Sequence, residues 1–286
     1  MTLFQPSVLK GFLSEIKARP KKALSQNFLT DGNILRKIVA AADTNSKDLI
    51  LEIGPGPGVL TEGLLKSGAS VLAVEKDEKF AQALNRFNTP SLQCLSTDFL
   101  AIDTEKELKK RLPPGLKAKV ISNIPYHLTG IILQRLLPLS EAISSLTLLV
   151  QEEVAQRCVS LPKTKSFSSF TLFTHYYSTP KLLFKVEPSC FFPQPKVRSA
   201  VVQFSLKKPT YNIDSSYFFQ ITKAAFTKRR KMLRSSLKSI YSPEIVENEL
   251  KKLGLKTTSR PEELSLDLFL KFARALKKEA KNTPSH

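Results

Sequence analysis

The pattern of short apolar runs is the feature that most restricts how this chain can fold. The runs are rich in Val, Ile and Leu, and stretches of helical character separate them. A parallel sheet covered by helices on both faces gives this alternation, because its strands are buried along their whole length. We therefore expect an α/β fold with a mostly parallel sheet. The predicted strands cover residues 49–53, 71–74, 92–95, 120–122 and 146–150.

Two later apolar runs, residues 182–186 and 200–206, predict an antiparallel pair at one edge of this sheet. Beyond Lys207 the pattern becomes helical, and residues 206–286 carry 18 Lys and Arg but only 8 Asp and Glu. We therefore expect a small, basic helical domain after the α/β domain. The expected helices cover residues 218–226, 228–240 and 266–278, with a further helix opening at Ser242-Pro243.

The whole chain is strongly basic, with 44 Lys and Arg against 25 Asp and Glu and a formal net charge of +19. A polyanion such as nucleic acid is the commonest partner of such a surface, and an anionic membrane is the alternative. The longest apolar runs are only strand-sized, so the sequence predicts no transmembrane helix. The first 23 residues lack the apolar core of a secretion signal, which favours the cytoplasm, and a basic transit peptide is the alternative.

Cysteine and histidine are too dispersed to indicate a metal site. The chain has three of each, and none shows the paired spacing that is typical of zinc ligands. We therefore expect no bound metal.

A Gly-rich turn, Gly54-Pro55-Gly56-Pro57-Gly58, follows the first predicted strand and precedes a helical segment at residues 59–66. This arrangement allows a ligand to approach the backbone closely. Two prolines remove amide donors that a pyrophosphate would need, so a compact cofactor with a zwitterionic tail suits the loop better. We expect Gly54 and Gly56 to contact that cofactor. The alternative is a tight turn that needs Gly only for its left-handed dihedral angles.

Acidic residues follow the second and third predicted strands. Glu75 stands 21 positions after Gly54, where a carboxylate can accept the hydroxyls of a ribose, and Asp98 can receive the amino group of an adenine. Either residue alone is more typical of a helix cap or a solvated acid. Together, at the carboxyl ends of adjacent strands, they predict a nucleoside cofactor. Carboxylates also suit S-adenosylmethionine, whose cationic sulfonium would otherwise face a basic surface.

The fourth predicted strand runs into Asn123-Ile124-Pro125-Tyr126. The Asn123 side-chain oxygen and the Ile124 carbonyl can accept both protons of an exocyclic amine and aim its lone pair at an electrophilic methyl group. Tyr126 can stack on a flipped-out adenine, and Phe191 or Phe192 can cover its other face. Such a tetrapeptide alone is more often a Pro-stiffened turn, and core packing is the alternative for one of the two phenylalanines. Because this loop follows the predicted cofactor residues at the next strand end, it indicates methylation of an adenine.

Basic clusters indicate where a nucleic acid would bind. The run Lys228-Arg229-Arg230-Lys231, followed by Arg234, would place cations over much of an expected helix and contact phosphates. Lys21 and Lys22 stand near the predicted cofactor entrance and support the same role. A solvated helix face is the alternative.

Ordered motifs along nearly the whole chain carry a family likeness. They are Ser25-Gln26-Asn27-Phe28-Leu29 and residues 52–61, 123–130, 192–197, 225–231 and 260–265. Together they resemble the small-subunit (16S) ribosomal RNA adenine N6,N6-dimethyltransferase family. The resemblance implies a Rossmann-like class I methyltransferase sheet with an antiparallel edge strand. It also implies S-adenosylmethionine-dependent dimethylation of two adjacent adenosines in the 3′-terminal hairpin of 16S rRNA.

Carried over residue by residue, the resemblance implies a role in cofactor binding for Asn27, Leu29, Gly54, Glu75, Asp98 and Asn123. It implies a basic arm and cofactor-entry segment at residues 1–30, the methyltransferase domain at 31–207 and an RNA-contacting helical domain at 208–286. The expected partner is small-subunit rRNA within a pre-mature subunit, whose biogenesis the enzyme would assist, and we expect a monomer.

The chain departs from the family pattern at two positions. Ser25 stands where the family usually has Gly, which bears on the flexibility of the entry loop. Arg198 stands where the family often has an acidic residue, so a local ion pair of the family would be missing. Large-subunit rRNA or DNA adenine is the alternative substrate. A non-catalytic ribosome-assembly or mitochondrial transcription factor is the alternative function, and the intact Asn123–Tyr126 loop favours catalysis.

Overall fold

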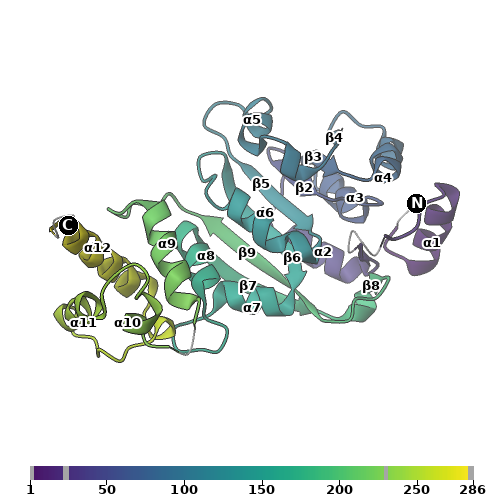
Figure 1. The fold of residues 1–286 in the computed structure, drawn as a ribbon. Helices are drawn as coiled ribbons and strands as arrows, with labels where there is room; N and C mark the ends of the chain where they lie inside the picture. The colour runs from purple at the N-terminus through teal and green to yellow at the C-terminus, as the bar shows by residue number, and fades with distance from the viewer. Residues whose placement is uncertain (1–2, 22–25, 229–230, 283–286) are drawn as a thin grey trace. The chain divides into compact units, whose positions relative to one another are not determined.

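The chain forms two compact units in the computed structural model, which describes residues 3–21, 26–228 and 231–282. Unit 1 comprises Met1–Ala155 and Ser178–Lys208, and unit 2 comprises Gln156–Tyr177 and Pro209–His286. Figure 1 shows the sheet of unit 1 and the helices of unit 2. Each unit has its own buried apolar core, so each is described by itself.

The interval between two strands of unit 1 belongs to unit 2. The sequence predicts that residues 156–177 belong to the methyltransferase domain, but in the structure they belong to unit 2. The reason is packing, because Phe167 and Tyr176 are buried in one cluster with Phe218 and Phe269 of the carboxyl-terminal helices. Sequence order alone does not show which core such a segment joins.

A seven-stranded sheet forms the centre of unit 1 (Figure 1). Its strands are β2 (Leu49–Ile53), β3 (Ser70–Glu75), β4 (Leu92–Ser96), β5 (Ala118–Asn123), β6 (Ile143–Gln151), β7 (Ser178–Val186) and β9 (Ser199–Leu206). They lie in the order β4-β3-β2-β5-β6-β9-β7. All seven predicted strands are thus present, and the predicted α/β class with a mostly parallel sheet is confirmed.

The antiparallel pair lies at one edge of this sheet, as predicted. Strand β9 is antiparallel to both β6 and β7. The strand that opposes the parallel set is therefore β9, one position inside the sheet, and the edge strand β7 runs in the parallel direction. Gly54 and the loops after β3, β4 and β5 all leave the same edge of the parallel strands, because their carboxyl ends lie in register.

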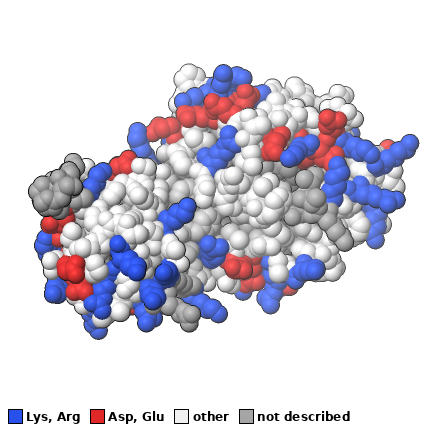
Figure 2. Space-filling view, viewed as in Figure 1, with Lys and Arg blue, Asp and Glu red and all other residues white. Residues whose placement is uncertain are grey.

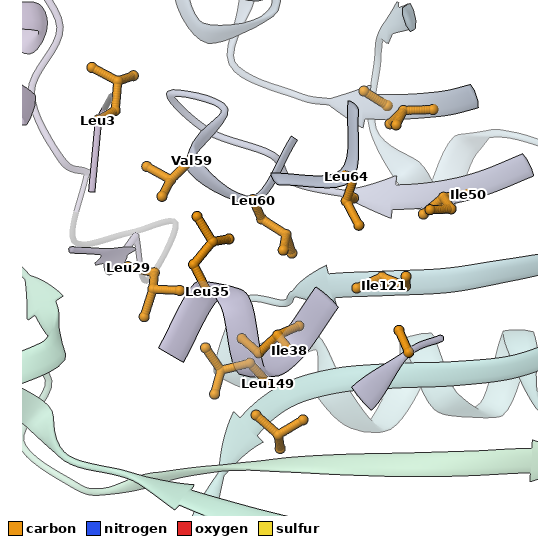
Figure 3. Close-up of a cluster of buried hydrophobic side chains, with 14 of the residues drawn as sticks. Leu3, Leu29, Leu35, Ile38, Ile50, Val59, Leu60, Leu64, Ile121 and Leu149 are labelled. Atoms are coloured by element: carbon orange, nitrogen blue, oxygen red, sulfur yellow. The ribbon is translucent and has the colours of Figure 1, made fainter. Parts of the chain in front are cut away.

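Helices lie along the sheet of unit 1 (Figure 1). They are α2 (Gly32–Ala41), α3 (Val59–Lys66), α4 (Glu78–Ala83), α5 (Thr104–Lys109) and α6 (Thr129–Leu136). Helix α1 (Pro6–Glu15) lies beyond the end of the sheet, and α7 (Glu152–Val159) begins in unit 1 and continues into unit 2. Figure 3 shows Leu35 and Ile38 of α2 beside Ile121 of β5 and Leu149 of β6. The neighbouring strand residues Val120 and Leu148 are also fully buried. Because successive strand side chains point to opposite faces, both faces of the sheet are covered.

A small second sheet ties the amino-terminal segment to the loop after β7. It pairs β1 (Phe28–Leu29) with β8 (Phe191–Phe192) in antiparallel register. The Thr30 backbone N–H also donates to the Cys190 carbonyl at 2.7 Å. This connection positions Asn27 beside the loops that follow the parallel strands.

Unit 2 is helical, as the sequence predicts. Its helices are α8 (Ser169–Tyr177), α9 (Ser215–Phe226), α10 (Leu233–Ser236), α11 (Pro243–Lys252) and α12 (Leu266–Asn282). Ser242 caps α11 by accepting the Ile245 N–H, which confirms the predicted Ser-Pro helix start. Among the described residues, no helix is both long and apolar enough to cross a membrane.

The predicted helix at residues 228–240 is wrong. Helix α9 ends at Phe226, and the Lys231 N–H closes a turn on the Lys228 carbonyl. Of the described residues between 228 and 240, only Leu233–Ser236 is helical. Within this run only positions 228 and 231 have the spacing that brings two cations together on a helix face, so charge repulsion there is a minor cost and the turn at Lys228 is what interrupts the expected helix. Lys228 and Lys231 therefore lie in the connection between α9 and α10 rather than on a helix face, and Arg229 and Arg230 lie outside the described residues.

Candidate active site

A cavity of about 320 Å³ opens at the carboxyl ends of the parallel strands in unit 1. Among the residues that line it are Asn27, Leu29, Gly54, Gly56, Glu75, Asp98, Asn123, Ile124, Pro125 and Tyr126. The structure thus brings all the predicted cofactor residues and the four residues of the predicted catalytic loop to one place. Phe191 and Phe192 do not line this cavity.

Left-handed glycines shape the loop after β2. Gly54, Gly56 and Gly58 have φ values of 64°, 55° and 83°, which disfavour any residue with a side chain. A Cβ at Gly56 would also stand 2.8 Å from Cε1 of Phe28. The loop therefore needs Gly56 both for its conformation and for the approach of the Phe28 ring to the cavity wall.

Glu75 is a buried acid that its own neighbourhood holds in place. Its side chain accepts the Gly56 N–H at Oε2 and the Asp77 N–H at Oε1, both at 2.8 Å. The residue is only 4% exposed, and burial raises the pKa of its carboxyl. Each oxygen retains a further lone pair, which is what a carboxylate needs to receive ribose hydroxyls from the cavity.

Glu52 lines the cavity and was not among the predicted site residues. It is 1% exposed, and Thr61 Oγ1 donates to its Oε2 at 2.7 Å. Burial raises the pKa of the Glu52 carboxyl to about 8, and the negative charge of Glu75 contributes to the rise. The signal in the sequence was an acid inside the otherwise apolar strand Leu49–Ile53, because an acid is almost never buried without a specific partner.

Asp98 follows β4 and lines the cavity, and each oxygen of its carboxylate accepts one hydrogen bond. The Leu100 N–H donates to Oδ1 and Lys76 Nζ donates to Oδ2, each at 2.8 Å. The hydrogen bond from Lys76 is the main reason that the pKa of Asp98 is lowered. Lys76 directly follows Glu75 and also lines the cavity. No pattern in the sequence indicates this pair, whose members stand 22 positions apart.

The predicted catalytic loop is fixed from two sides. Asn123 Nδ2 donates to the Asn27 backbone carbonyl at 2.9 Å, so Oδ1 is the atom of this amide that remains as an acceptor. The hydroxyls of Tyr126 and Ser199 lie 2.6 Å apart, and Ser199 is fully buried at the start of β9. Burial raises the pKa of Tyr126, which keeps its hydroxyl neutral. The loop thus holds an amide oxygen and an aromatic ring at the cavity.

The two phenylalanines predicted to cover a base have different surroundings. Phe191 is 2% exposed and packs in the core cluster of unit 1. Phe192 is partly exposed, and Lys10 Nζ lies 5.0 Å from the centre of its ring. Of the two, only Phe192 has a face that a base could meet without disrupting the core.

The predicted RNA-binding residues fall in both units. Lys22, Arg229 and Arg230 lie outside the described residues. Lys21 pairs with Asp77 at 2.6 Å, and Arg234 forms an ion pair with Glu247. Lys228 and Lys231 are exposed in the connection after α9. Lys and Arg side chains are spread over the visible face of unit 2 (Figure 2).

The two departures from the family pattern have different outcomes. Ser25 lies outside the described residues. Arg198 has acidic neighbours, because its Nε lies 3.9 Å from a carboxylate oxygen of Glu152 and 3.9 Å from one of Glu187. The cation at this position thus forms long ion pairs of its own. Among the described residues, no group of three His, Cys, Asp or Glu side chains is arranged to hold a metal ion.

The chain matches known proteins over most of its length. The model of the family described as "Ribosomal RNA adenine dimethylase" matches residues 17–278. The chain belongs to this family. It is 50% identical over 278 residues to "Ribosomal RNA small subunit methyltransferase A" of Protochlamydia amoebophila (strain UWE25), covering 96% of this chain and 98% of that protein. The protein of the same name from Chlamydia caviae is 40% identical, covering 98% and 100%.

Solved structures of similar fold include two other methyltransferases. A dimethyladenosine transferase from Plasmodium falciparum aligns with a TM-score of 0.72 and 22% identity, covering 88% of this chain and 98% of that one. The 23S rRNA methyltransferase ErmE aligns with a TM-score of 0.67 and 23% identity, covering 88% and 100%. At such identities the likeness concerns the fold, and it confirms the predicted Rossmann-like methyltransferase sheet.

As a member of the dimethylase family, the protein is a methyltransferase that uses S-adenosylmethionine. The cavity fits this group on its own chemistry. The buried carboxylate of Glu75 suits a ribose, Asp98 suits an amino group of a base, and the loop at Gly56 lets a ligand approach the backbone. The loop after β2 does not suit a pyrophosphate, because Pro55 and Pro57 have no N–H and the Gly54 and Gly56 N–H groups are bonded to the Val74 carbonyl and to Glu75.

Proposed function

We propose that this protein dimethylates N6 of two adjacent adenosines in the 3′-terminal hairpin of small-subunit (16S) rRNA. The observation that carries the chemistry is the anchored amide of Asn123, whose nitrogen is engaged by Asn27 at the edge of a cavity that suits a nucleoside cofactor. The substrate class follows from relatives at 40–50% identity, which are named ribosomal RNA small subunit methyltransferase A.

The amide of Asn123 addresses the main chemical difficulty of the reaction. The N6 amine of adenine is a weak nucleophile because its lone pair is delocalised into the ring. Asn123 Oδ1 and the Ile124 carbonyl would accept hydrogen bonds from its two N–H groups. These bonds would favour a pyramidal nitrogen and direct its lone pair toward the reacting methyl group. Bound S-adenosylmethionine supplies that methyl as an electrophile.

The two acceptors act most strongly as the reaction proceeds. Positive charge develops on N6 while the new bond forms, and oxygens already oriented toward it stabilise that charge better than the neutral substrate. Asn123 cannot rotate freely to serve as a donor instead, because its nitrogen is bonded to Asn27. No side chain of this loop needs to act as a nucleophile, and the proton of N6 can leave after methyl transfer.

Tyr126 would provide the platform for the target base. Its ring is positioned by the hydrogen bond to Ser199, and one base stacked on an aromatic ring gains about 1–3 kcal/mol. This gain helps to offset the cost of removing the adenine from its own stack. Phe192, which is partly exposed, is the better candidate of the two phenylalanines for the opposite face of the base.

Unit 2 would contact the RNA through phosphates. Lys228 and Lys231 are exposed, and a cation in a connecting loop can reach a phosphate without the constraint of a helix face. We propose that the protein acts as a monomer in the cytoplasm on a pre-mature small subunit and contributes to its biogenesis. Folded RNA is recognised largely by shape and charge, which suits a basic domain of this kind.

Incubation with labelled S-adenosylmethionine tests the proposed substrate. Undermethylated small ribosomal subunits, large subunits and duplex DNA are offered separately to the purified full chain. Label is expected in small-subunit rRNA. Label confined to large subunits or to DNA would assign a different substrate to the same site, and absence of label from all three would favour a non-catalytic assembly role.

A further inference from the structure

Lys76 is the one cation among the described residues of the cavity wall that touches a predicted cofactor ligand. It directly follows Glu75 at the end of β3, and its Nζ lies 2.8 Å from Asp98 Oδ2. The Lys76 side chain is 61% exposed, whereas that of Asp98 is 35% exposed. The pair therefore joins a flexible, solvated cation to a carboxylate that its own loop holds more firmly.

The loop after β4 fixes the carboxylate of Asp98. The Leu100 N–H occupies Oδ1, and Arg135 donates to the backbone carbonyls of Leu100 and Ile102. The Arg135 guanidinium also lies 5.8 Å from the centre of the Phe99 ring. The Leu100 N–H takes one acceptor position of Oδ1 and Lys76 takes one of Oδ2, so each oxygen can accept a further donor, and at Oδ2 that donor meets the ammonium of Lys76.

We propose that Lys76 determines how strongly the cofactor site prefers adenine, by competing with the adenine amino group for Asp98 Oδ2. The inference rests on the proposed function, in which Asp98 receives that amino group. An ammonium ion and an amino N–H are both donors, and a carboxylate oxygen that already binds an ammonium accepts a second donor less strongly. Lys76 thus weakens the binding of adenine to the site.

The same residue has the opposite effect on a purine with an oxygen at this position. Hypoxanthine carries a carbonyl oxygen where adenine carries its amino group. That oxygen is repelled by the carboxylate of Asp98, but it can accept a hydrogen bond from Lys76. Lys76 therefore narrows the difference in affinity between the two bases. A structural link between two strand ends, in contrast, would change the affinity for both bases alike.

Isothermal titration calorimetry with two neutral ligands tests this inference. The ligands are S-adenosylhomocysteine and S-inosylhomocysteine, which carry no sulfonium and differ at the 6-substituent of the purine and at N1, which bears a proton in hypoxanthine. The full-length wild type is compared with Lys76→Gln. The matched control is Lys66→Gln, which removes a lysine paired with Glu62 on α3, away from this cavity.

Exposed ion pairs are weak, so the expected changes are modest. Lys76→Gln should bind S-adenosylhomocysteine about two- to five-fold more tightly and S-inosylhomocysteine about two- to five-fold less tightly. Lys66→Gln should match the wild type with both ligands. High salt should tighten wild-type binding of S-adenosylhomocysteine, because it screens the pair, and should leave Lys76→Gln less affected.

Two results would overturn the inference. An equal change for both ligands in Lys76→Gln, or no change for either, would show that Lys76 does not select the base although the site binds the cofactor. A wild type that binds neither ligand would instead overturn the proposed function on which the inference rests. Thermal unfolding of Lys76→Gln, expected to match that of Lys66→Gln, separates these effects from loss of folding.

Discussion

The side-chain nitrogen of Asn123 donates to the backbone carbonyl of Asn27, and the two atoms lie 2.9 Å apart. This bond joins the end of β5 to the segment before β1, which β8 in turn holds in place. It decides which atom of the amide serves as the acceptor. The amino-terminal segment therefore orients the predicted catalytic loop as well as lining the cofactor cavity.

Asn123→Asp tests whether this orientation matters. The carboxylate retains two acceptor oxygens, but it cannot donate to Asn27 and would place a negative charge against a carbonyl. We expect the rate of methyl transfer to fall by about 10²-fold or more, a loss typical of one misplaced electrostatic group. Single-turnover kinetics with bound cofactor measures this rate. A variant as fast as the wild type would show that the bond to Asn27 has no catalytic role.

Gly56→Ala should weaken cofactor binding. The new Cβ would meet the Phe28 ring at 2.8 Å, and φ at this position is 55°, which strains any residue with a side chain. We expect a loss of at least about 1 kcal/mol in stability and a larger loss in affinity for S-adenosylhomocysteine. Equilibrium unfolding and calorimetry measure the two effects.

Gly11→Ala is the matched control for this substitution. Gly11 lies in α1, and a Cβ there would have no neighbour within 4 Å. The variant should gain up to about 1 kcal/mol in stability, since Ala favours a helix over Gly, and should bind the cofactor normally. Equal loss of cofactor affinity in both variants would contradict the role assigned to the loop.

Glu52 should make stability depend on pH. Its pKa rises from 4.5 to about 8 on folding, so between these values the folded chain holds a proton that the unfolded chain has released. The free energy of unfolding should therefore fall as pH rises from about 4.5 to 8, by about 1 kcal/mol per pH unit, and the contribution is greatest below 4.5.

Glu52→Gln removes this dependence because the amide has no proton to lose. The variant should gain stability relative to the wild type as pH rises from 5 to 8, by roughly 3 kcal/mol. Urea unfolding at each pH measures the difference. The control Glu15→Gln changes an exposed acid on α1 and should follow the wild type. A constant difference between Glu52→Gln and the wild type would contradict the assigned pKa.

Lys228 and Lys231 should contribute salt-dependent affinity for RNA. Replacing both by Ala should lower affinity without changing which RNA is preferred, and should reduce the slope of log affinity against log salt by about 1.5. Filter binding to small-subunit rRNA across a salt series measures both quantities. Removing two cations at the end of α5, Lys109 and the following Lys110, with Lys109→Ala and Lys110→Ala, should leave the slope unchanged if the effect is local to the connection after α9.

Much of the sheet was predictable from the sequence because parallel strands are apolar throughout. The predicted strand at residues 49–53 matches β2, and the helix at 59–66 matches α3. The cofactor-binding residues at the strand ends could also be predicted, because the topology places the carboxyl ends of parallel strands together. Glu75 and Asp98 could thus be assigned to one site before any contact was known.

Features that depend on long-range packing were not predictable. The helix expected at residues 228–240 is an exception with a local cause, because the Lys231 N–H closes a turn on the Lys228 carbonyl after α9 ends. The ion pair of Lys76 with Asp98 links two loops, and no local sequence pattern predicts it. Likewise, the assignment of residues 156–177 to unit 2 depends on which aromatic side chains enclose Tyr176.

Mass spectrometry of the methylated nucleoside tests the central claim most directly. Undermethylated small subunits are incubated with S-adenosylmethionine and either the wild type or Asn123→Ala, and their 16S rRNA is digested to nucleosides. The wild type should yield N6,N6-dimethyladenosine at two adjacent positions, and Asn123→Ala, with unchanged thermal unfolding, should yield at least about 10²-fold less. Dimethyladenosine formed equally by Asn123→Ala, or none formed by the wild type, would contradict the account.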